Sequence, residues 1–96
     1  MRKKVVPKAI PNCLKKYRKA RGLKQKEAAE VLGFKSASMI SRWERGVCLP
    51  SAINLFRLAA LYRRMTDALF IDLLRALRVD LHRREERILS RSKATK

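Results

Sequence analysis

The chain has 96 residues, and its 25 Lys and Arg residues against 8 Asp and Glu give a formal net charge of +17 at pH 7. This length corresponds to one small domain, and an apolar content of 47% is sufficient for a compact core. Three glycines and an aromatic fraction of only 6% argue against an all-β fold, whereas abundant Leu, Ala, Arg and Lys favour helices.

The charge restricts the class of partner. A positive charge this large opposes folding through self-repulsion unless a polyanion relieves it, so we expect nucleic acid as the partner, with an anionic membrane surface a distant second. No apolar run approaches the length of a membrane span. The basic start at Arg2, Lys3 and Lys4 also lacks the apolar segment of a secretion signal.

The two cysteines, Cys13 and Cys48, are isolated in the sequence, and His82 is the only histidine. Without paired cysteines or further ligands, we expect no metal site and no cofactor. Two free thiols suit a reducing compartment, so we expect the protein in the cytoplasm. The sequence also has no Ser, His and acid set and no glycine-rich phosphate loop, which argues against an enzyme.

Residues 1–11 form a basic arm in which Pro7 and Pro11 disfavour a helix. One interpretation is a disordered terminus. The other is a segment that lies along DNA phosphates or in the minor groove.

The first helix is predicted to begin at Asn12, a suitable N-cap, and to end at Arg21 before Gly22. Leu14 and Tyr17 share its inner face. The other, lysine-rich face of this helix is expected to be exposed to solvent, next to residues 25–46.

Residues 25–46 predict two short helices joined by a tight turn. The first spans residues 25–32, where apolar residues recur with the spacing of one helical face, and Gly33 can adopt the positive φ of a helix C-cap. Ser36 can cap a second helix over about residues 37–45.

The second of these helices presents a polar, basic face. Ile40 and Trp43 point inward, and Gly46 ends the helix. The side chains that can face outward are Ser38, Ser41, Arg42 and Arg45. A helical hairpin of this kind can present a rod of side chains to the DNA major groove.

Lys24 departs from the local rule for a helix start. A cation at the N-cap opposes the helix dipole, and the missing cap costs about 1 kcal/mol, which Glu27 in the first turn partly offsets. Such a departure is expected at functional sites. Either a DNA phosphate docks on the exposed amides at Gln25 beside Lys24, or Lys24 is a tolerated surface lysine.

Pro50 and Ser51 are predicted to cap a fourth helix over about residues 52–63. Its apolar residues are too many for a single inward stripe, so one side should meet the core and the other a partner or the last helix. They are Ile53, Leu55, Phe56, Leu58, Ala59 and Tyr62.

Thr66 is predicted to cap the last helix, which contains no Gly or Pro and can continue to about Ser90, before a basic tail. Its apolar stripe, interrupted by Arg84, consists of Phe70, Leu74, Leu77, Leu81 and Ile88. The stripe either folds back onto its own domain or forms a dimer seam. The excess of apolar residues on the fourth helix favours a dimer interface at Phe70, Leu74, Leu77 and Leu81.

A resemblance to a known family rests on the string SRWERG (residues 41–46) with an upstream Arg21-Gly22-Leu23 and Gln25. The run from Leu14 to Phe70 resembles the phage repressor and Cro type of helix-turn-helix, the xenobiotic-response-element (XRE) family of transcriptional regulators. The other matching residues are Leu14, Tyr17, Arg18, Ala29, Leu32, Gly33, Ile40, Pro50, Ser51, Leu58, Ala59, Asp67, Ala68, Leu69 and Phe70.

The resemblance implies roles at the matching positions. Gln25 resembles the glutamine that binds a DNA phosphate, and Arg18 and Glu44 resemble the pair that ties the first helix to the end of the third. Base edges are read in this family at the positions of Ala37, Ser38 and Arg42. Of these, Arg42 alone can make a bidentate contact to guanine. The predicted DNA-binding residues are Lys24, Gln25, Lys35, Ser36, Ala37, Ser38, Ser41, Arg42 and Arg45.

Two departures from the family pattern qualify these expectations. The turn before Ile40 is one residue longer than the commonest spacing, so Lys35 or Ser36 can approach the DNA instead of Ala37. Arg63 stands where the family usually has Gly, which predicts a different turn before the last helix but the same fold.

The sequence therefore predicts an all-α fold, a five-helix lambda-repressor-like helix-turn-helix domain (residues 12–70) between the arm (1–11) and a C-terminal helical extension with a basic tail (71–96). The predicted function is a transcriptional regulator, a repressor or an activator, that binds an inverted-repeat operator in double-stranded DNA as a homodimer. The alternative is an RNA- or ribosome-associated adaptor with the same fold, for which aromatic stacking platforms are missing.

Overall fold

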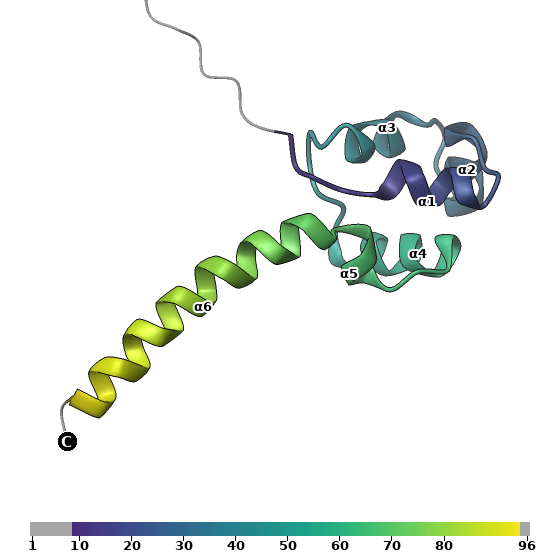
Figure 1. Cartoon of the computed structure of the whole chain (residues 1–96). Helices are drawn as coiled ribbons and strands as arrows, with labels where there is room; N and C mark the ends of the chain where they lie inside the picture. Colours follow the sequence, from purple (N-terminus) through teal and green to yellow (C-terminus); the bar gives the residue numbers. More distant parts are fainter. Residues whose placement is uncertain (1–8, 95–96) are drawn as a thin grey trace, which may run out of the picture.

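Six helices account for most of residues 9–94, the part of the chain that the computed structural model describes. They are α1 (Leu14–Ala20), α2 (Gln25–Leu32), α3 (Ser38–Glu44), α4 (Ala52–Tyr62), α5 (Thr66–Leu69) and α6 (Ile71–Ala94). Helices α1 to α5 lie against one another, and α6 extends away from them as a rod (Figure 1). No strand occurs in residues 9–94, and the predicted all-α class is confirmed, with six helices rather than five.

The core consists of apolar side chains from α1 to α5 together with Phe70. Its buried members are Leu14, Ala28, Ala29, Leu32, Ile40, Trp43, Leu58, Tyr62, Leu69 and Phe70. The ring of Phe34 packs edge-on against Trp43, with centroids 5.9 Å apart and planes at 67°. The apolar periodicity that predicted each inner face therefore converges on one cluster.

The start of α1 and the whole of α2 follow local capping rules. Helix α1 begins at Leu14, two residues after the predicted N-cap, and the side-chain oxygen of Asn12 accepts a hydrogen bond from the Leu14 N–H at 3.1 Å. Helix α2 has the predicted bounds, and Gly33 ends it with a φ of 82°. Glu27 accepts the N–H of Lys24 at 2.8 Å, while the lysine side chain can accept nothing, so the weak cap is offset by Glu27.

Helix α3 starts one residue later than predicted, at Ser38, with Ala37 as its N-cap. The reason is local: the hydroxyl of Ser36 reaches the Ser38 N–H at 3.4 Å, a turn-type contact two residues along the chain. At its other end, Gly46 has a φ of 75° and packs so closely on the arm that an added Cβ would lie 2.5 Å from the carbonyl oxygen of Ile10. The Ile10 N–H also donates to the Gly46 carbonyl at 3.0 Å, which fixes the described end of the arm on this turn.

The prediction of a different turn at Arg63 is wrong. Ser51 caps α4 by accepting the Asn54 N–H at 3.3 Å, and the helix ends with Arg63 in the left-handed conformation, φ 58° and ψ 48°. This is the backbone geometry that the family's glycine would take, at a cost of roughly 1–2 kcal/mol for an L-residue. The Arg64 N–H then donates to the Ala59 carbonyl at 3.0 Å and closes the helix end.

The single last helix predicted from Thr66 onward is interrupted at Phe70, which has φ −130° and ψ 41°, and Met65 rather than Thr66 is the N-cap of α5. The carbonyl of Leu69 accepts the N–H of Cys13 at 2.8 Å, a bond to the start of α1 that a continuous helix would not make. Phe70 itself is buried in the core. Its predicted place in a dimer interface is therefore wrong, because the side chain already packs inside its own domain.

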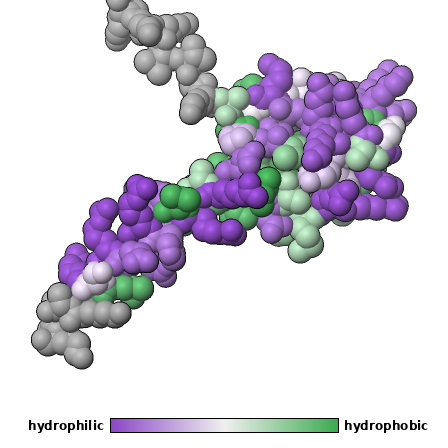
Figure 2. Space-filling view, viewed as in Figure 1, coloured by the Kyte–Doolittle hydropathy of each residue, from purple (hydrophilic) through white to green (hydrophobic). Residues whose placement is uncertain are grey.

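The α6 stripe does not fold back onto the domain. Leu73 packs against the core and Leu74 is half-buried, but Leu77 is 50% exposed, Leu81 62% and Ile88 51%. Figure 2 shows hydrophobic surface where α6 leaves the other helices and a mostly hydrophilic rod beyond it. Of the two predicted alternatives, packing of the stripe on its own domain therefore applies only to the first turn of α6.

Candidate nucleic-acid interface

A buried ion pair joins the first and third helices. Arg18 Nε donates to Glu44 Oε2 at 2.6 Å and Arg18 Nη2 to Glu44 Oε1 at 3.1 Å, with side-chain exposures of only 7% and 4%. Arg18 Nη1 donates to the carbonyl of Leu23 at 2.8 Å, so the guanidinium also holds the loop before α2. This bidentate geometry fixes the end of α3 relative to α1.

The start of α2 is part of the same network. Gln25 Nε2 donates to Glu44 Oε1 at 2.9 Å, which ties the first residue of α2 to the last residue of α3. Asn12 Nδ2 lies within hydrogen-bond distance of the carbonyls of Trp43 (3.1 Å) and Glu44 (3.3 Å), at the end of α3. Nothing in the sequence pattern indicated this second role of Asn12.

Burial and charge around the pair shift two pKa values. The hydrogen bonds that Arg18 donates to the Glu44 carboxylate raise the pKa of Arg18 above its usual value, against the lowering effect of burial. Burial raises the pKa of Tyr62 to about 12; the charge of Glu44 adds to this and that of Arg18 opposes it. Both groups therefore keep their protons at physiological pH.

The predicted DNA-binding residues fall in two places on the hairpin. Lys24 and Gln25 lie at the start of α2, which the Gln25–Glu44 hydrogen bond holds against the end of α3. The others lie on the turn or on α3: Lys35, Ser36, Ala37, Ser38, Ser41, Arg42 and Arg45. The side chains of Arg42 and Arg45 are exposed, and Arg45 Nε donates to Ser41 Oγ at 3.2 Å. Ser36 and Ser38 are exposed at the opposite end of α3, their hydroxyls 3.0 Å apart.

Arg57, on α4, contacts the end of α2 and so supports the hairpin, a role that the sequence did not predict. Its Nη2 donates to the carbonyl of Leu32 at the end of α2, and its Nη1 donates to Asn54 at 3.0 Å. The guanidinium lies 5.8 Å from the centre of the Phe34 ring. An arginine within a mainly apolar helix was the one available signal, and it could equally have been a solvated side chain.

Comparison with known families gives one result: the helix-turn-helix family model HTH_3 matches residues 14–69, more than half of the chain. The chain belongs to this helix-turn-helix family, the Cro and repressor type. No curated protein and no solved structure matches the chain.

As a helix-turn-helix protein, the chain is a DNA-binding regulator, and its family is regulatory rather than enzymatic. The hairpin is α2 and α3, and the matched region ends at Leu69, immediately before the break at Phe70. Cys13 and Cys48 are both free. Within residues 9–94, none of the helices is long and apolar enough to cross a membrane.

Proposed function

We propose that this helix-turn-helix protein binds specific operators in double-stranded DNA as a homodimer and regulates transcription, most simply by blocking polymerase at a promoter. The observation that carries the proposal is the rigid mounting of α3. The buried Arg18–Glu44 pair and the Gln25 hydrogen bond fix this helix at one end, and its exposed polar side chains point away from the core. A recognition helix has to be held in this way to place side chains against base edges.

The start of α2 would receive a DNA phosphate. Gln25 uses one side-chain N–H on Glu44, which leaves its second N–H and the backbone N–H groups of the first turn for an anion. Lys24 lies beside them at the N-cap, where its charge opposes the helix dipole until a phosphate neutralises both. Because Gln25 touches Glu44 at the end of α3, this phosphate contact would set the depth of α3 in the groove.

Arg42 would read bases. Its exposed guanidinium can make two parallel hydrogen bonds to guanine, whereas Ser38 and Ser41 can accept or donate only single bonds. Lys35 and Ser36, in the longer turn, lie beside the start of α3 and would contact the backbone or the neighbouring bases. Trp43 is buried, so it cannot stack on unpaired bases as an RNA-binding aromatic would.

The distribution of charge supports binding by the helical domain. Four of the eight acidic residues of the chain lie on α6, namely Asp72, Asp80, Glu85 and Glu86. The residues before α6 are therefore the more basic part. One recognition helix contacts too few base pairs to select a single site, so we propose that the protein binds as a dimer to an inverted-repeat operator. We propose the cytoplasm as its location, because the DNA lies there.

The experiment is selection of bound fragments from a pool of random duplexes, repeated for Gln25→Ala and Arg42→Ala. Gln25→Ala should weaken binding to all sequences by a similar factor, because a phosphate contact positions without specifying. Arg42→Ala should cost about 1–3 kcal/mol at the selected site and flatten the preference at one base pair. Arg83→Ala, an exposed arginine of α6, is the control and should leave the selected motif unchanged.

Two results would contradict the proposal. One is identical motifs for the two hairpin variants, which would remove the assigned roles. The other is a slope of log affinity against log salt shallower than about −3 on duplex DNA, since each neutralised phosphate contributes about 0.9 to that slope. Structured RNA tested at the same salt should bind more weakly than the selected duplex, and tighter binding to RNA would favour the adaptor function.

A further inference from the structure

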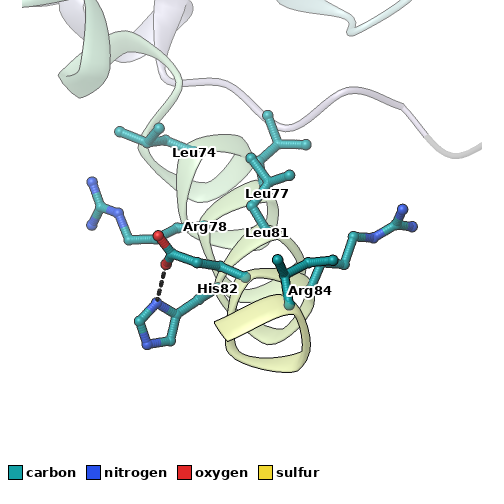
Figure 3. Close-up of a pocket in the computed structure, with 8 residues that line it drawn as sticks. Leu74, Leu77, Arg78, Leu81, His82 and Arg84 are labelled. Carbon is teal, nitrogen blue, oxygen red and sulfur yellow. Dashed lines mark ion pairs between the residues drawn. The ribbon is translucent and has the colours of Figure 1, made fainter. Parts of the chain in front are cut away.

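Helix α6 carries an apolar row that its own domain covers only in part at Leu74 and leaves exposed from Leu77 onward. Leu74, Leu77, Leu81 and Ile88 line a shallow groove along one side of the helix. Figure 3 shows Leu77 and Leu81 one after the other along the helix and Leu74 beside them near its start, with Arg78 and His82 on one flank and Arg84 on the other. An isolated helix is marginal in water, and most helical stability comes from packing of an apolar face. A helix of 24 residues that projects alone into solvent therefore needs a partner.

The row has the seven-residue period of a coiled-coil seam. In the heptad notation, Leu74, Leu81 and Ile88 occupy the a positions, and Leu77, Arg84 and Arg91 occupy the d positions. The flanking e positions are Arg78 and Glu85, and the flanking g positions are Asp80 and Arg87. These four flanking charges, two of each sign, determine which pairing of two α6 helices is attractive.

We propose that α6 pairs with α6 of a second copy in the antiparallel orientation, in the register that places Leu77 against the partner's Ile88. In this orientation e positions face e positions and g positions face g positions across the seam. Arg78 then meets the partner's Glu85, and Asp80 meets the partner's Arg87. The two-fold axis repeats both contacts, so every flanking charge faces its opposite.

The competing arrangements bring like charges together. A shift of one heptad in one direction sets Arg78 against Arg78 and Asp80 against Asp80 of the two copies. A shift of one heptad in the other direction sets Glu85 against Glu85 and Arg87 against Arg87 of the two copies. A parallel pair would place Asp80 against the partner's Glu85 and would stack the two copies of Arg84 in the seam. Like charges across a seam select against these registers.

The chosen register also covers the whole of α6, because Ile71 comes to lie opposite the partner's Ala94. The two copies of Ile71 are then 23 residues apart along the pair, about 35 Å at 1.5 Å per residue. The two helix-turn-helix domains therefore lie at opposite ends of the pair, since α6 leads away from each of them (Figure 1). One turn of DNA is about 34–36 Å, so the pair can space two half-sites by a turn or more.

The second copy is the occupant that the charges favour. Half of the acidic residues of the chain lie on α6, and on the flanks of the apolar row they alternate with basic residues, two of each sign. This mixed pattern is complementary to a second copy of the same helix, whereas a DNA or membrane surface of one sign would leave the flanking Asp80 and Glu85 unpaired. In the single chain, Arg84 is held by Asp80 at 3.3 Å and His82 lies 3.6 Å from Glu85. The e and g charges on the seam flanks nevertheless remain exposed and available to a partner.

The pairing deepens the proposed function, but it is measured without DNA, by sedimentation equilibrium of the full chain at fixed salt. Arg78→Glu and Glu85→Arg should each raise the dimer dissociation constant about ten-fold, because two attractive contacts become repulsive. An equimolar mixture of the two variants should restore the wild-type constant, since each unlike pair is attractive again. Arg83→Glu and Glu86→Arg, the same charge changes on the opposite face of α6, are matched controls and should leave the constant unchanged.

Three outcomes would overturn the proposal. A tighter dimer for Glu85→Arg would show a parallel pair, in which this residue faces Asp80. Failure of the mixture to restore the dimer would show another register, and a monomeric wild type would show that α6 does not self-associate. Helicity by circular dichroism excludes unfolding as the cause. Binding to a single half-site is measured separately, and its absence in the wild type would refute the proposed function while leaving the pairing intact.

Discussion

Replacing Arg18 with Met tests whether the buried pair holds the recognition helix in place. The substitution keeps an unbranched apolar side chain of about the length of the arginine stem and removes the guanidinium, with its bonds to Glu44 and to the Leu23 carbonyl. Glu44, 4% exposed, then keeps only the N–H of Gln25 as a side-chain partner. Removing one member of a buried pair costs about 3–5 kcal/mol. For a chain of this size, a loss of 3 kcal/mol lowers Tm by roughly 12 °C or more.

The assay is thermal and urea unfolding followed by circular dichroism. Lys19→Met, a neighbouring exposed cation of α1, is the matched control and should change Tm little. The double variant Arg18→Met with Glu44→Leu should recover much of the loss, because an apolar pair often replaces a buried ion pair without penalty. If Arg18→Met melted within about 2 °C of the wild type, below the shift that 1 kcal/mol gives, the pair would contribute nothing to the placement of α3.

Three further predictions concern other features of the fold. In the folded protein the pKa of Tyr62 is raised to about 12, from an ordinary value of about 10 in the unfolded chain. The contribution of Tyr62 to the free energy of unfolding is therefore complete below pH ~10 and is lost as the pH rises to ~12. Tyr62→Phe should remove this alkaline loss of stability. Urea titrations across that range would refute this if both proteins declined alike. Arg63→Gly should raise the free energy of unfolding by up to about 1 kcal/mol, since it relieves a left-handed arginine, and a lower midpoint would contradict it. Arg84→Leu should tighten the proposed dimer by filling the seam opposite the partner's Leu81, and a weaker dimer by sedimentation would count against that packing.

Local interactions explain what the sequence could predict. The bounds of α2, its left-handed end at Gly33 and the Ser51 cap of α4 each depend on residues at most five positions apart. Apolar periodicity identified the inner faces of α1 and α3 for the same reason, since the helical repeat is a property of the chain itself. On α4 the apolar residues were too many to show which side is buried, and the structure buries Leu58 and Tyr62 while Ile53 and Phe56 stay exposed. The helix-turn-helix family followed from a contiguous string around Arg42.

Contacts between distant residues decided the rest. The break at Phe70 follows from a hydrogen bond between Cys13 and Leu69, and Gln25 meets Glu44 across nineteen positions. Whether an arginine caps another helix, as Arg57 does at Leu32, depends on which surfaces the fold brings together. By itself the sequence determined the first four helices, the inner faces of α1 and α3 and the basic charge of the chain. The tertiary structure decided that Phe70 lies in the core and that the apolar row from Leu77 onward is exposed. The same apolar spacing is compatible with packing on the chain's own core and with packing on a partner, and only the path of the chain selects between the two.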